Sequence, residues 1–145
     1  MATVSVTEQI NAPAEKVWAL VADFGGTDQW IPGVGSLSVV GQGVGAIRTA
    51  TLASDSGSIS GEIQERLETY DADEYTYSYA IIGESPLPVT DYLASMTVTE
   101  DTAGSCSVTW VSMWEPVAVP EQQIREMLEG LYRASLANVQ RMLSK

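Results

Sequence analysis

The 145-residue sequence contains no histidine and only one cysteine, Cys106. Without histidine, the chain cannot form the Ser–His or Cys–His pairs that activate many enzyme nucleophiles. A single cysteine cannot form an intrachain disulfide, and the two absences together leave too few ligands for the usual zinc sites. We therefore expect no metal and no cofactor. Acid–base chemistry has to come from carboxyl, phenol, amino or guanidinium groups, or from water.

Basic residues are also scarce, with 7 Lys and Arg against 19 Asp and Glu, and the net charge is -12. Nucleic acids and anionic lipid surfaces are bound through clusters of cations, so we expect neither as a partner. No apolar run approaches the ~20 residues of a membrane helix, and the N-terminal residues lack the features of a secretory signal. These properties predict one soluble domain over residues 1–145, located in the cytoplasm.

The hydrophobic period changes twice along the chain. Alternation over residues 3–10 indicates a strand, after which Asn11 is placed to cap a short helix that has a proline in its first turn. Thr27 is placed to cap a second short helix, extending through Ile31. Between Ser36 and Pro116 a period of two predicts six strands, at residues 36–41, 45–53, 57–70, 74–82, 89–100 and 105–115.

The connections between these strands determine the expected architecture. They are short and rich in glycine or aspartate, which predicts an antiparallel meander. After Pro120 the period returns to 3.6 and predicts an amphipathic C-terminal helix of about 24 residues. The fold class is therefore α+β, with a curved seven-stranded antiparallel sheet, two short helices and one long helix. Because such a sheet is wider than one helix, we expect a cavity between them.

Four segments have a recognisable order and spacing: residues 11–18 with Asp23, Phe24 and Trp30; residues 41–48; residues 65–68 with Asp71 and residues 77–79; and residues 108–110 with the last helix. Together they resemble the Bet v 1/START-like (SRPBCC) superfamily, in particular its bacterial polyketide cyclase/dehydrase-like branch. The resemblance implies a helix-grip fold with a deep pocket for small, mostly apolar molecules. Members include lipid carriers, hormone receptors and aromatase/cyclases, so the fold alone does not determine the function.

One loop of the sequence also resembles a functional element of that superfamily. Residues 83–88, followed by Asp91, Tyr92 and Ser95, occupy the position of the loops that close the pocket in the abscisic-acid receptors. The histidine of those receptors is missing here, which argues against a hormone receptor. The resemblance still implies a pocket entrance at this loop.

Two charged residues on neighbouring strands are candidates for catalysis. Arg48 shares a strand face with Ala46, but the alternation does not show whether that face points inward. It either faces solvent or enters the pocket, where it would bind a carboxylate, enolate or phenolate. Glu65 shares a face with Ile63 and Leu67, and burial would make it an acid or base. The alternatives for Glu65 are a salt bridge to Arg48 or a position open to water.

Aromatic residues are candidates for the pocket wall. Tyr77 and Tyr79 share one strand face, and Tyr92 lies on the apolar face of its strand. An aromatic ring with a hydroxyl group suits a mixed pocket. The alternative is cross-strand packing on a half-exposed sheet. Trp110 is expected in the core or the pocket wall, and Trp30 at the pocket floor or mouth.

The last helix has one polar residue in its apolar stripe, Ser135, with Leu131 and Tyr132 beside it. The resemblance to cyclases implies that a polar residue at this position faces the ligand. The alternatives are that Ser135 is simply small or that its hydroxyl bonds to its own helix.

Three functions are compatible with these residues. The first is an enzyme similar to polyketide cyclases or dehydratases, in which Arg48 stabilises an enolate while Glu65 or a tyrosine moves protons. The second is a non-catalytic protein that binds or carries a small hydrophobic or aromatic molecule or a lipid. The third is a protein-interaction module that acts through its sheet or loops.

Overall fold

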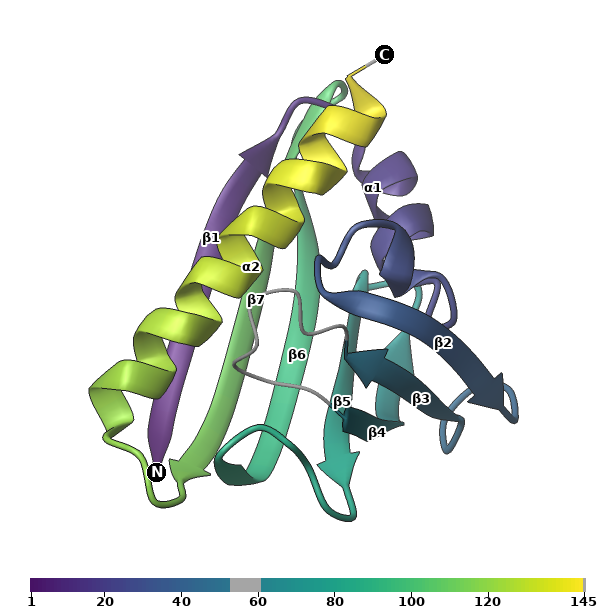
Figure 1. Ribbon diagram of the computed structural model, residues 1–145. Coiled ribbons are helices and arrows are strands. Elements are labelled where there is room, and N and C mark those ends of the chain that lie inside the picture. The colour runs from purple at the N-terminus through teal and green to yellow at the C-terminus, as the bar shows by residue number, and fades with distance from the viewer. Residues whose placement is uncertain (53–60, 145) are drawn as a thin grey trace.

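The computed structural model describes residues 1–52 and 61–144 of the chain. They form one antiparallel sheet of seven strands, in the order β1-β7-β6-β5-β4-β3-β2 (Figure 1). The strands are β1 (Ala2–Ile10), β2 (Val34–Val40), β3 (Ile47–Leu52), β4 (Gly61–Asp71), β5 (Thr76–Ile82), β6 (Val89–Thr102) and β7 (Ser105–Pro116). The helices are α1 (Ala14–Val21), the 3-10 turn η1 (Thr27–Gln29) and α2 (Glu121–Leu143).

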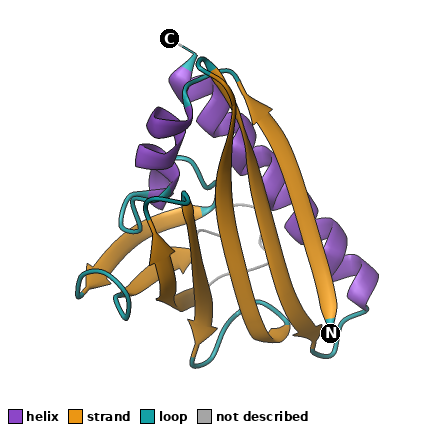
Figure 2. Cartoon of the chain, turned by 180° about the vertical axis from the view of Figure 1, so that it is seen from behind, coloured by secondary structure: helices purple, strands orange, loops and turns teal. Residues whose placement is uncertain are grey.

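The helices lie on one side of the sheet. Seen from behind, the strands are in front and both α-helices lie beyond them (Figure 2). The long helix α2 packs over β1 and β7, and α1 packs against α2, β6 and β7. This arrangement confirms the predicted helix-grip fold. None of the helices in the described ranges is long and apolar enough to cross a membrane.

The strand predictions agree with the structure to within a few residues, because tight turns separate runs of clear alternation. Every neighbouring pair in the sheet is antiparallel, as the short connections predicted. The expected start of a strand at residue 57, and the end of the preceding one at residue 53, lie outside the described residues.

Both predicted helix caps are wrong. Pro13 directly precedes α1 and is its N-cap, with no capping hydrogen bond from a side chain in the described part of the chain. Asn11 lies two residues too early, and its backbone N–H donates instead to Oε1 of Gln140, at 2.8 Å. The N-cap of η1 is Gly26, and the helical turn ends at Gln29 rather than Ile31. Thr27 is turned toward β3, as described below.

The core forms where the inner face of the sheet meets the helices. Strand β7 shows the alternation most clearly, because every second side chain from Cys106 to Trp114 is buried. The same face of β1 and the apolar stripe of α2 complete this layer, with Val4, Val6, Ile10, Ile124, Leu128, Leu136 and Val139. Trp18 of α1 belongs to the core and stacks on Tyr75 with ring centroids 5.4 Å apart. At the end of the core nearest β3 and β4, polar side chains line a cavity, which is described in the next section.

Candidate functional site

A cavity of about 110 Å³ lies between α2 and the sheet. Its rim consists of half-buried apolar side chains from β2, β3, α2 and the loops, namely Ile31, Val34, Leu37, Leu52, Leu87 and Leu131. Deeper in, the wall carries charged and hydroxyl groups. The family resemblance implied a pocket in this place without giving its size, and the buried rings of Tyr79, Tyr92, Trp110 and Tyr132 line the cavity found here.

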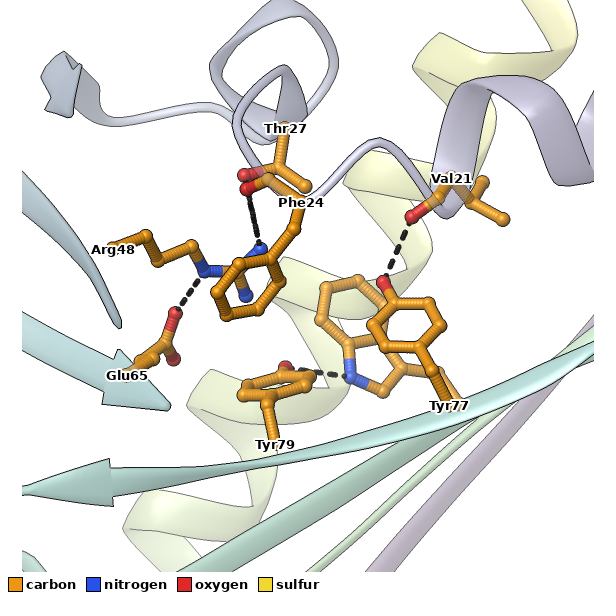
Figure 3. A network of polar contacts seen from close by, with 8 residues as sticks. Val21, Phe24, Thr27, Arg48, Glu65, Tyr77 and Tyr79 are labelled. Carbon is orange, nitrogen blue, oxygen red and sulfur yellow. Dashed lines mark hydrogen bonds and ion pairs between the residues drawn. The ribbon is translucent and has the colours of Figure 1, made fainter. Parts of the chain in front are cut away.

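Arg48 enters this cavity from β3. Its side chain is only 3% exposed, which resolves the question that strand alternation left open. The Nε atom donates to Oε1 of Glu65 at 2.8 Å, and Nη1 donates to the carbonyl of Phe24 at 3.2 Å and to Oγ1 of Thr27 at 3.4 Å (Figure 3). Arg48 and Glu65 are directly opposite one another in the β3–β4 register. The arginine therefore joins the sheet to the loop between α1 and β2.

Two aromatic rings hold the guanidinium group. The Cζ atom of Arg48 lies 4.1 Å from the centroid of Phe24 and 4.8 Å from that of Tyr79, distances at which cation–π attraction operates. Burial is the largest single influence and lowers the pKa of Arg48. The charge of Glu65, the nearby phenols of Tyr77 and Tyr79 and the hydrogen bond to Glu65 together outweigh it, so the pKa is raised overall. Arg48 is a permanent, positioned cation in the cavity wall.

Glu65 has the salt bridge that the sequence offered as an alternative. Its side chain is 14% exposed and lines the cavity beside Arg48. The pair brings equal and opposite charges to one site, so its net charge is zero. The proposed role of Glu65 as an acid or base stays a prediction.

Tyr79 and Trp110 lie on the same wall. The indole Nε1 of Trp110 donates to the hydroxyl of Tyr79 at 3.1 Å, and the Trp110 ring stacks on Tyr132 with centroids 4.0 Å apart. Burial raises the pKa of Tyr79 well above its ordinary value, and the negative charge of Glu65 adds to the effect. Near neutral pH this hydroxyl therefore keeps its proton.

The hydroxyl groups of Tyr92 and Tyr132 meet at 2.5 Å, and Tyr132 donates to Oγ of Ser112 at 2.8 Å. Burial raises the pKa of Tyr132 to about 12 and that of Tyr92 well above its ordinary value. These three residues form a continuous chain of hydrogen bonds from β6 through α2 to β7. All of its members are uncharged near neutral pH.

A backbone irregularity aims Tyr92 inward. Asp91 has a φ of 56°, in the left-handed region, and the β6–β7 register shifts between Thr90 and Leu93. Such a bulge re-aims the neighbouring side chain. Tyr92 also lines a second, more polar hollow of about 470 Å³ next to Glu84 and Asp91. The loop that was expected at the entrance contributes Leu87 to the cavity rim.

Three predicted ligand-binding residues are buried but do not line the cavity as the described residues define it: Trp30, Tyr77 and Ser135. The Ser135 hydroxyl donates to the Leu131 carbonyl at 2.7 Å, which is the bond to its own helix that was considered as an alternative. Trp30 packs edge-on against Trp110, and the hydroxyl of Tyr77 donates to the Val21 carbonyl at 2.8 Å. Direct contact with a ligand stays a prediction for all three residues.

Sequence reasoning did not identify the site roles of Phe24, Thr27 and Ser112. Phe24 lies in the connection after α1 and Thr27 begins the three-residue turn η1, and both segments are too short for a hydrophobic period to indicate direction. Ser112 lies on the buried face of β7, and its alternation with Trp110 and Trp114 was the signal that could have found it. Among the residues described here, no group of three metal-ligating side chains gathers at one place.

Comparisons with known proteins agree with the fold. A family model described as "Polyketide cyclase / dehydrase and lipid transport" matches residues 1–143. A crystal structure from Bacillus thuringiensis is 28% identical to this chain, with a TM-score of 0.86, and the match covers 99% of this chain and 100% of that one. No curated protein sequence matches.

Two more distant structures share the fold alone. The di-domain ARO/CYC BexL of the BE-7585A biosynthetic pathway is 18% identical, with a TM-score of 0.80, over 97% of this chain and 46% of that one. Norcoclaurine synthase of Thalictrum flavum, in complex with dopamine and hydroxybenzaldehyde, is 18% identical. Its TM-score is 0.74, over 97% of this chain and 85% of that one.

Proposed function

The chain belongs to the polyketide cyclase/dehydrase and lipid transport family, and from that membership we propose that it binds a small, mostly apolar organic molecule between the sheet and α2. The observation that carries the proposal is the cavity of about 110 Å³, which has an apolar rim and a few polar groups deeper in. Ligand sites typically combine apolar walls with a small number of polar groups that orient the ligand. The Arg48–Glu65 pair and the hydroxyl of Tyr79 are those groups here.

The volume limits the size of the ligand. An engineered cavity of about 150 Å³ in another protein accommodates benzene, whereas drug-sized ligands need roughly 300–1,000 Å³. The cavity of about 110 Å³ is smaller than both, so without rearrangement the ligand is at most a single small ring. This size favours binding of a small molecule over the folding of a long polyketide chain.

Filling the cavity tests this proposal. Ala50 lines the cavity and is 6% exposed, and Ala50→Ile adds three carbon atoms to its wall. We expect at least tenfold weaker binding of cyclohexanone, measured by ligand-observed NMR, with an unfolding free energy equal to or above that of the wild type. Ala137→Ile, at an exposed position of α2, is the control and should bind like the wild type. Equal binding by Ala50→Ile, or no binding by the wild type, would contradict the proposal.

A second candidate is a cyclase- or dehydratase-like enzyme. It is favoured by the presence of a buried cation, a carboxylate and a phenol on one apolar cavity wall, at Arg48, Glu65 and Tyr79. In this role Arg48 stabilises an enolate oxygen, and Glu65 removes the proton whose loss forms the enolate. The distant likeness to BexL and to norcoclaurine synthase is compatible with such chemistry.

A small diketone provides the test of this second function. Heptane-2,6-dione closes to 3-methylcyclohex-2-enone when an enolate carbon attacks the far carbonyl and water is then lost. If Glu65 is the base, Glu65→Gln slows the catalysed reaction by about a hundredfold. Glu68→Gln, in an exposed ion pair on the same strand, should leave the rate unchanged. No acceleration by the wild type, or equal rates for both variants, would rule out this assignment.

A further inference from the structure

The four buried tyrosines differ in whether their hydroxyl groups donate a hydrogen bond to an acceptor in the protein. Tyr77 donates its hydrogen to the Val21 carbonyl, and Tyr132 donates to Ser112. A phenol has one hydrogen to give. Since Tyr132 gives its hydrogen to Ser112, the contact between Tyr92 and Tyr132 has to be donated by Tyr92. Three of the four hydrogens therefore already have protein acceptors.

Tyr79 is the exception. The indole N–H of Trp110 can only donate, so in their 3.1 Å contact the Tyr79 oxygen is the acceptor. The Tyr79 hydrogen has no acceptor within residues 1–52 and 61–144, although the ring is 2% exposed. Tyr79 lines the cavity, whereas Tyr77 does not appear on the described part of its wall. A buried donor without a partner is costly, and a ligand acceptor would remove that cost.

The charges on the wall restrict which acceptor fits. The positive charge of Arg48 is matched by Glu65 at 2.8 Å, and the Nη2 atom of Arg48 has no acceptor in the described part of the chain. An anionic ligand would add a buried charge with no counterion to a pair that is already neutral. The carboxylate of Glu65 on the same wall would also repel it. An uncharged oxygen acceptor avoids both costs.

We propose that Tyr79 donates the hydrogen bond that orients the ligand, and that the ligand presents the oxygen of an uncharged carbonyl compound rather than a carboxylate. This inference rests on the proposed binding function and specifies the ligand class. The Arg48 Nη2 atom is a second donor on the same wall. The cavity of about 110 Å³ limits such a carbonyl compound to a single small ring.

The experiment compares wild type and Tyr79→Phe with two probes of equal heavy-atom number, cyclohexanone and methylcyclohexane. Removing the hydroxyl lowers the affinity for the ketone by about fivefold, the effect of one neutral hydrogen bond, and leaves the affinity for the hydrocarbon unchanged. Tyr75→Phe is the matched control. Tyr75 is half-buried, stacks on Trp18 and is not part of the described cavity wall, so both affinities should stay as in the wild type.

A second comparison needs no variant. The wild type should bind cyclopentanecarboxamide at least tenfold more tightly than cyclopentanecarboxylate, a molecule of the same heavy-atom number that differs in charge. Tighter binding of the carboxylate overturns the inference about ligand class. A Tyr79→Phe variant that binds the ketone as the wild type does, or loses both probes equally, overturns the role of Tyr79. If the wild type binds none of the four probes, the proposed function fails as well.

Discussion

Replacing Arg48 with methionine is expected to lower the free energy of unfolding by about 3 kcal/mol, the low end of the cost of breaking a buried ion pair. The substitution leaves the carboxylate of Glu65, which is 14% exposed, without its counterion. It also removes the donor to the Phe24 carbonyl and the cation held between two aromatic rings. In a chain of this length the midpoint of thermal unfolding should fall by roughly 6–12 °C.

A second variant shows whether the loss of stability comes from the unpaired charge or from lost packing. The free energies of unfolding of both variants and the wild type are measured in urea. Arg48→Met combined with Glu65→Leu removes both charges, and we expect it to recover to within about 1 kcal/mol of the wild type. Arg66→Met is the control, because the Arg66–Glu68 pair lies at the surface and should contribute nothing measurable. If Arg48→Met alone is as stable as the wild type, the ion pair does not stabilise the site as described.

The second large effect is unfolding at alkaline pH. Burial raises the pKa of Tyr77 and Tyr132 to about 12, and those of Tyr79 and Tyr92 well above their ordinary value. In the unfolded chain these phenols ionise near pH ~10. Between pH ~10 and ~12 the unfolded state therefore binds fewer protons than the native state, so stability is complete below this range and falls as the pH rises.

The expected loss of stability is large enough to unfold the protein. Two tyrosines whose pKa is raised by about two units each lose on the order of 5 kcal/mol across the range, comparable to the whole stability of many domains. Far-ultraviolet circular dichroism and tyrosinate absorbance should be followed together against pH, and the absorbance change of the four buried tyrosines should coincide with the loss of dichroism. Ionisation of all six tyrosines near pH ~10 with unchanged dichroism would contradict the burial of these four.

The fold could be predicted from the sequence because its determinants are local. Two-residue alternation on β7 and the apolar stripe on α2 each indicate one buried face, and short turns order the strands. The helix caps could not be predicted so well. Asn11 and Thr27 are both good capping residues, and only the path of the chain decides which backbone groups they meet.

The site was predicted only in part, for a physical reason. Arg48 shares its strand face with Ala46 and Ala50, and small residues occur on either face of a sheet. In the structure both alanines and Arg48 are buried, and the guanidinium group lies over the ring of Phe24, which comes from the connection after α1. The two-residue alternation along a strand predicts which way a side chain points, but it does not predict how far the strand lies from the helices and loops that pack on it. The cavity volume and the unmatched hydrogen of Tyr79 both depend on those distances.

The most direct test of the central claim is the indole N–H resonance of Trp110 in a titration of the wild-type protein with cyclohexanone. Trp110 lines the cavity and donates to Tyr79, whereas Trp114, on the same strand, lies outside the described wall. We predict a saturable shift of the Trp110 resonance and none for Trp114. If the Trp110 resonance does not move, or if every indole resonance drifts linearly without saturation, the cavity does not bind ring-sized molecules and the account is wrong.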